Sequence, residues 1–138
     1  MNSEANVSER MRLAPYLTVS DGQAALTFYQ EAFDAEVLET YPYENKLGHA
    51  SITVNDAEVM LADAFDVSIT GMRSPESLGG TPVSISLNVD DPDLWFDRAV
   101  AAGATVLRPL TDEFYGRAGK IVDPFGHVWG LVGPDPRR

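Results

Sequence analysis

The chain of 138 residues carries one pattern twice, and this internal repeat constrains its fold more than any other feature. Residues 32–38 (AFDAEVL) align with residues 101–107 (AAGATVL) at an offset of 69, with four identities in seven positions. Upstream, residues 17–21 (LTVSD) align with residues 87–91 (LNVDD) at an offset of 70. The repeat therefore predicts two modules with the same order of helices and strands.

Each module is expected to be a βαβββ unit. In the first half, an alternating strand over residues 13–20 precedes a helix over residues 23–33, which starts after the N-cap-type Asp21. Three more strands should follow, because Pro, Asn and Asp residues separate short alternating segments. These strands are expected at residues 36–41, 48–54 and 57–62.

The second half repeats this order. A strand over residues 83–89, a helix over residues 93–102 and strands from residue 105 onward follow a connector rich in Ser, Pro and Gly. We predict an α+β fold in which two βαβββ modules form a curved mixed sheet with the helices on its outer face. The expected boundaries are a flexible N-terminus at 1–10, a single domain at 11–134 with modules 11–65 and 82–134 and connector 66–81, and a tail at 135–138.

The composition restricts the partners. The formal net charge is −11, which disfavours nucleic acid and anionic membranes and favours a cationic ligand, or simply keeps the protein soluble. The absence of Cys excludes disulfides and thiolate metal sites and fits a reducing compartment. Because no apolar run approaches the roughly 20 residues of a membrane span and residues 1–10 lack a signal-peptide core, we expect a cytoplasmic location.

Several segments resemble the vicinal oxygen chelate superfamily, which includes glyoxalase I, extradiol dioxygenases, fosfomycin-resistance enzymes and bleomycin-resistance proteins. The segments are residues 15–21 (PYLTVSD), 28–33 (FYQEAF), 101–104 (AAGA) and 123–129 (DPFGHVW). Residues 79–82 (GGTP) and 123–127 (DPFGH) look most similar to a bacterial subgroup associated with phosphonate operons. The resemblance implies a homodimer, in which two modules pair around each cavity.

Metal-dependent members of that superfamily bind a divalent ion through His, Glu or Gln on the first and last strands of each module. The corresponding positions here are Ala14, Met60, Ser84 and Gly130, with Ala62 in place of Met60 if the register slips by two. None of these side chains replaces an imidazole or a carboxylate. We therefore expect no metal and no cofactor.

The concave face should instead hold a small molecule. The spacing of residues 83–89 places Ser and Asn side chains there, so the wall is expected to be polar but uncharged. His49 and Ser51 share one face of their strand, and Trp95, Phe114 and Tyr115 are candidates for an aromatic rim. The candidate ligand-binding residues are Tyr16, Thr18, His49, Ser51, Met60, Ser84, Ser86, Trp95, Phe114 and Tyr115.

No catalytic nucleophile motif is present, and three interpretations of the function remain. The lack of metal-ligating side chains favours a metal-independent binding protein of the bleomycin-resistance type. Such a protein sequesters an aromatic, cationic or peptide-type natural product in antibiotic resistance or biosynthesis. The alternative is a glyoxalase- or dioxygenase-type lyase or isomerase with a displaced metal site at His49, or a metal-free enzyme with Tyr16 or Asp63 as its acid–base group. A dimeric scaffold without a small ligand is a third reading.

Overall fold

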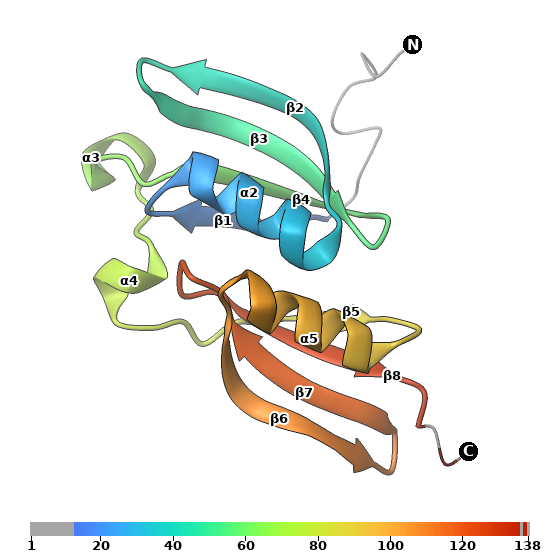
Figure 1. Ribbon diagram of the computed structural model, residues 1–138. Coiled ribbons are helices and arrows are strands. Elements are labelled where there is room, and N and C mark those ends of the chain that lie inside the picture. The colour runs from blue at the N-terminus through green and yellow to red at the C-terminus, as the bar shows by residue number, and fades with distance from the viewer. Residues whose placement is uncertain (1–12, 136, 138) are drawn as a thin grey trace.

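A computed structural model describes residues 13–135 and residue 137, so the prediction for the N-terminus at 1–10 lies outside the described residues. The chain forms two four-stranded sheets, and each follows the order of a βαβββ unit (Figure 1). The first module contains β1 (Tyr16–Val19), α2 (Gly22–Phe33), β2 (Glu36–Tyr43), β3 (Lys46–Val54) and β4 (Ala57–Asp63). The second contains β5 (Ser84–Asn88), α5 (Pro92–Ala102), β6 (Thr105–Glu113), β7 (Gly116–Val122) and β8 (Val128–Gly133).

The predicted α+β fold of two repeated modules is confirmed, with the strands divided between two sheets instead of joined in one. The strand orders are β1-β4-β3-β2 and β5-β8-β7-β6. In each sheet the first and last strands of the module pair in parallel, and the other neighbours are antiparallel. The two halves therefore share topology as well as sequence pattern.

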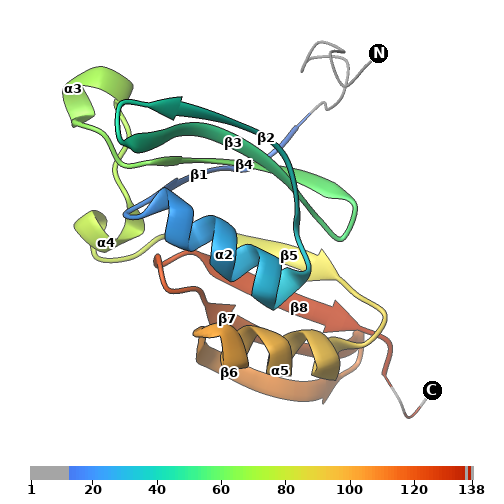
Figure 2. The ribbon, with the colours of Figure 1, turned by 45° about the horizontal axis from the view of Figure 1, so that its top comes forward.

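The connector between the modules contains two single-turn helices, α3 (Val67–Thr70) and α4 (Pro75–Leu78), where sequence reasoning expected only loop. Each has a local cause, because a polar side chain caps its start and a glycine ends it. Asp66 accepts hydrogen bonds from the backbone N–H and the hydroxyl of Ser68, and Gly71 ends α3 with a φ of 74°. Figure 2 shows both short helices together at one end of the two sheets.

The long helices begin and end as their sequences predict. Asp21 caps α2 by accepting a hydrogen bond from the N–H of Ala24, and Asp91 caps α5 through the N–H of Leu94. Asp34 ends α2 in the left-handed conformation, with a φ of 53°. Both helices cover the same side of the molecule and contact each other, which leaves the opposite face of each sheet uncovered by them (Figures 1 and 2).

An aromatic cluster fills the space between the helices and the sheets. The indole of Trp129 is fully buried, with its ring centroid 4.9 Å from that of Phe33 and 5.6 Å from that of Tyr29. Trp129 therefore faces the helices, as its alternation with Gly130 along the strand predicts. Because Tyr29 and Phe33 come from α2 and Trp129 from β8, the cluster joins the two modules through apolar burial.

A buried carboxylate adds polar contacts to this junction. Asp123 Oδ2 accepts hydrogen bonds from the Tyr29 hydroxyl at 2.5 Å and from Trp129 Nε1 at 2.9 Å. Asp123 Oδ1 accepts from the backbone N–H groups of Phe125 and His127. Burial and the Asp123 carboxylate raise the pKa of Tyr29 well above its ordinary value, so the phenol stays protonated and donates.

The described part of the chain has no helix that is long and apolar enough to cross a membrane.

Candidate ligand-binding site

The uncovered face of the first sheet, here called the first open face, carries Tyr16, Thr18, His49, Ser51, Met60 and Glu39. The backbone register places four of them in one row across the sheet. Tyr16 of β1 pairs with Met60 of β4, Met60 with Ser51 of β3, and Ser51 with Glu39 of β2. Five predicted ligand-binding residues, Tyr16, Thr18, His49, Ser51 and Met60, thus share this face.

Tyr16 and His49 form a hydrogen-bonded pair on the first open face. The Tyr16 hydroxyl lies 2.8 Å from His49 Nδ1, and the Ser51 hydroxyl lies 3.4 Å from His49 Nε2. Burial raises the pKa of Tyr16, so its phenol carries a proton at neutral pH. The phenol donates to Nδ1 when the imidazole proton is on Nε2, and its oxygen accepts when that proton is on Nδ1.

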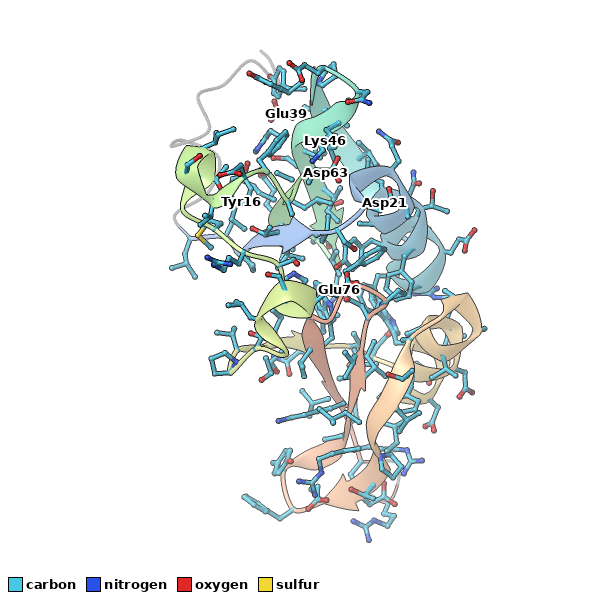
Figure 3. The ribbon with its side chains drawn as sticks, turned by 90° about the vertical axis from the view of Figure 1, so that its left-hand side faces the viewer. Tyr16, Asp21, Glu39, Lys46, Asp63 and Glu76 are labelled. Carbon is cyan, nitrogen blue, oxygen red and sulfur yellow. The ribbon has the colours of Figure 1, made fainter. Side chains whose placement is uncertain are left out.

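A cavity of about 530 Å³ lies beside Tyr16. Its lining comes from all four strands of the first sheet, from the residues that follow β4, and from α3 and the segment after it. Tyr43, Phe65, Ile69 and Met72 make the lining mostly apolar. Figure 3 looks at this side of the molecule and labels Tyr16 and Asp63, which line the cavity.

Asp63 also borders the cavity, but its carboxylate is used to fix the fold. Its oxygens accept hydrogen bonds from the backbone N–H of Gly22 at 2.7 Å and from that of Leu47 at 2.6 Å. These contacts fasten the end of β4 to the start of α2 and to β3. The structure therefore gives Asp63 a positioning role and does not support it as an acid–base group.

The uncovered face of the second sheet, here called the second open face, differs in charge from what the sequence predicted. The row that matches Tyr16, Met60, Ser51 and Glu39 consists of Ser86 of β5, Gly130 of β8, Lys120 of β7 and Arg108 of β6. The expectation of an uncharged wall is wrong, because it considered β5 and β8 alone. A register break between Val106 and Arg108 sets which β6 side chain joins the row.

The remaining predicted residues are divided between different surfaces. Ser84 and Ser86 are exposed on the second open face, and Phe114 and Tyr115 are exposed at the turn between β6 and β7. Trp95 lies elsewhere: it stacks on Phe33 at 6.0 Å between ring centroids, on the helix side of the sheets. The rim position expected for Trp95 is therefore wrong, because the contact between α2 and α5 uses its ring as core.

Sequence reasoning missed much of the cavity wall. Tyr43 is not among the predicted site residues, and Ile69, Thr70 and Met72 lie in the connector at residues 66–81, where no site residue was predicted. The available signal was the apolar character of these residues within a segment otherwise rich in Ser, Pro and Gly. No periodicity accompanies such a signal, so the sequence alone did not place them against β1.

The residues at the superfamily's metal positions do not fit a divalent ion. Ala14, Met60, Ser84 and Gly130 present a methyl group, a thioether, a hydroxyl and no side chain, whereas such ions require imidazole or carboxylate donors. Among residues 13–135 and 137, no group of three or more His, Cys, Asp or Glu side chains is placed to hold a metal ion.

Comparison with known proteins agrees with this architecture. The profile of the Glyoxalase/Bleomycin resistance protein/Dioxygenase superfamily matches residues 12–131. An uncharacterized protein of Mycobacterium tuberculosis is 46% identical over 125 residues, which cover 88% of this chain and 74% of that protein.

Solved structures show the same fold. TioX from Micromonospora sp. ML1 superposes with a TM-score of 0.69 and 26% identity, over 89% of this chain and 95% of TioX. The fosfomycin resistance protein FosX from Mesorhizobium loti gives a TM-score of 0.64 over 88% of this chain and 90% of FosX. At 16% identity, the likeness to FosX shows the fold alone.

Proposed function

The chain belongs to the Glyoxalase/Bleomycin resistance protein/Dioxygenase superfamily, and we propose that it binds a small planar molecule, without a metal ion, in the cavity beside Tyr16. The observation that carries the proposal is the cavity itself, which has a volume of about 530 Å³ and a mostly apolar wall. Small-molecule sites are typically apolar concavities of about 300–1,000 Å³ with a few polar groups that orient the ligand.

The chemistry of the wall favours an aromatic or peptide-type natural product. Tyr43 and Phe65 provide flat surfaces at 5.7 Å between ring centroids, and Met72 provides a flexible one. The donor set at the superfamily's metal positions supports binding without a metal. We infer that the protein sequesters its ligand, in antibiotic resistance or in biosynthesis, and that it does so in the cytoplasm, in keeping with the absence of Cys.

We also infer a homodimer in which the first open face of one protomer lies over the second open face of the other. Leu13 and Val83 support it, because they occupy equivalent places before the first strand of each module and have exposed fractions of 92% and 63%. Tyr16 is also 47% exposed beside the cavity. A second copy that covers both faces would remove these apolar side chains from water and complete the site.

The test is thermal unfolding of the purified protein with planar natural products and, separately, with divalent ions, each with and without a chelator. A ligand that binds only the folded state raises the melting temperature. We expect a planar compound to raise it equally with and without chelator. An increase with nickel, zinc, iron or manganese that chelator reverses would contradict the proposal.

A matched pair of variants locates the binding site. Ala62 lines the cavity from β4, and Ala101 is exposed on α5. Ala62→Leu should fill part of the cavity and abolish the increase caused by the planar compound, whereas Ala101→Leu should preserve it. Equal responses in the two variants would show that the compound binds elsewhere.

A second candidate function rests on the Tyr16–His49 hydrogen bond. A phenol hydrogen-bonded to an imidazole beside a cavity is an arrangement able to move a proton to or from a bound molecule without a metal. Tyr16→Phe keeps the ring and removes the hydroxyl, so it separates the two functions. A binding protein should retain its ligand in this variant, and an enzyme should bind the ligand but lose conversion of it to product.

A further inference from the structure

We propose that Arg108 and Lys120 form a subsite for an anionic group of the bound molecule. The two side chains lie on neighbouring strands of the second open face, where the register pairs Arg108 of β6 directly with Lys120 of β7. Like charges in directly opposite positions destabilise an antiparallel pair. Both side chains are exposed, and an anion placed between them would offset the repulsion that solvent leaves unscreened.

No side chain in the described part of the protein supplies that anion. Arg117, by contrast, is held by Asp93 at 3.0 Å and by Asp112 at 2.9 Å. Neither Arg108 nor Lys120 has an ion-pair partner or a side-chain hydrogen bond among residues 13–135 and 137.

The two cations border a groove of about 210 Å³. The groove also contains the carboxylate of Glu113, which accepts a hydrogen bond from the hydroxyl of Thr111 at 2.6 Å. That bond directs the one acidic group among the described lining residues toward Thr111. The cationic side of the groove is left for an external group.

The side chains around the cations indicate the chemistry of that group. The guanidinium of Arg108 matches the two oxygens of a carboxylate or a phosphorus oxyanion, and the ammonium of Lys120 acts as a point charge beside it. Gly130 follows Lys120 in the row, where a Cβ would meet the Lys120 side chain at 3.9 Å, and the Ser86 hydroxyl lies beyond it as a further donor. The subsite therefore suits a compact oxyanion, not a second aromatic ring.

This subsite deepens the proposed function and rests on it, since it assigns one group of the same ligand. In the inferred homodimer, the second open face of one protomer covers the first open face of the other. A ligand would place its apolar part in the cavity beside Tyr16 and its anionic group on Arg108 and Lys120 of the second protomer.

The acidic side chain of a second copy is the competing occupant. Glu39 holds the row position in the first module that Arg108 holds in the second. The structure favours a small anion for two reasons. The cations line a concave groove, and the Glu39 carboxylate already accepts a hydrogen bond from the Tyr41 hydroxyl at 2.7 Å.

The test uses the full chain in a phosphate-free buffer, with backbone amide signals followed by NMR during titration with phenylphosphonate, benzoate, benzyl alcohol or inorganic phosphate. We expect phenylphosphonate and benzoate to shift the amides of Arg108 and Lys120, and benzyl alcohol to leave them in place. Lys120→Gln should weaken phenylphosphonate binding about tenfold or more, the usual effect of losing a charged hydrogen bond. Arg98→Gln, which removes one positive charge on the helix side, should not weaken it.

Folding controls accompany the variants. Lys120 is exposed and its removal relieves repulsion, so Lys120→Gln without ligand should melt at or above the temperature of the unchanged protein. An unchanged affinity for phenylphosphonate in this variant overturns the subsite. The subsite is also overturned if Lys120→Gln weakens the dimer in sedimentation experiments but leaves anion binding unaltered. That result would show that the cations pair with a second copy of the chain.

Two further outcomes separate this proposal from the cavity on which it rests. Inorganic phosphate that binds as tightly as phenylphosphonate would overturn the assignment of the anion to an organic ligand. Anion shifts confined to Arg108 and Lys120, with no aromatic compound affecting the amides of Tyr16 and Met72, would reject the proposed cavity function and retain the anion site.

Discussion

Replacing Asp123 with Asn should lower the free energy of unfolding by about 3–5 kcal/mol. The carboxylate of Asp123 accepts four hydrogen bonds, two from backbone N–H groups and two from the side chains of Tyr29 and Trp129. An amide of the same shape has one oxygen, so its NH₂ group must face two donors in either orientation. The indole N–H of Trp129 cannot reverse its role, because it has no acceptor.

The magnitude follows from the two side-chain bonds. A hydrogen bond to a charged group contributes about 1.5–3 kcal/mol, and a buried donor left without a partner costs a comparable amount. Tyr29 can recover part of the loss by accepting from the new amide, which brings the expected total to about 3–5 kcal/mol. Since domains of this size are stabilised by only about 5–15 kcal/mol, the variant should be close to the limit of folding.

Urea unfolding followed by tryptophan fluorescence measures this change. Both tryptophans of the chain, Trp95 and Trp129, contact Phe33 and should report on the junction of the modules. With a denaturant slope of about 1–3 kcal/mol per M, the midpoint should fall by at least about 1 M. Asp97→Asn, an exposed change on α5, is the matched control and should leave the midpoint in place. A loss below about 1 kcal/mol for Asp123→Asn would refute the reasoning.

Three other changes test separate features of the fold. Because burial raises the pKa of Tyr29, the unfolded chain ionises first as pH rises, so the stability contributed by this phenol is complete below pH 10 and falls above it. Tyr29→Phe should therefore be less stable at neutral pH but lose less stability than the unchanged protein between pH 10 and 11 in urea titrations. Gly116→Ala should lower the free energy of unfolding by about 2 kcal/mol or more, since the φ of Gly116 is 142° and a Cβ would lie 2.4 Å from the carbonyl oxygen of Gly133. A smaller loss in urea unfolding would show that the backbone adjusts. His127→Phe removes the 2.9 Å contact between Nε2 and the Thr18 carbonyl, so it should lower the free energy of unfolding by about 1 kcal/mol. An unchanged melting temperature would show that this contact is not needed for stability.

The architecture could be predicted from the sequence because the same pattern occurs in both halves of the chain. The aligned segments around Val19 and Val89 determine where each first strand ends, and their Asp residues predict both helix starts. The strand alternation also determines which face carries Tyr16, His49 and Met60. The alternation within one strand does not show which residues of the adjacent strands lie beside it. The row that joins Ser86 to Lys120 and Arg108 therefore came from the observed register.

The cavity was less predictable for a different reason. Its outer wall comes from the connector, where Ile69 and Met72 have no periodic pattern and are placed by the caps of one short helix. Trp95 shows the opposite error. An aromatic residue near the start of a helix appeared available for a rim, but the contact between α2 and α5 buries part of its ring against Phe33.

The two equivalent rows also record how the halves have diverged. On the helix side, Leu17 and Val19 in the first module match Leu87 and Val89 in the second. On the open side, none of the four row positions has kept the same residue: tyrosine, methionine, serine and glutamate in one half stand where serine, glycine, lysine and arginine stand in the other. The helix-facing residues thus stayed alike in both halves, whereas the two sets of residues on the open faces diverged. A relative could acquire a new ligand by exchanging residues in one row, without any change to the interior that both halves require.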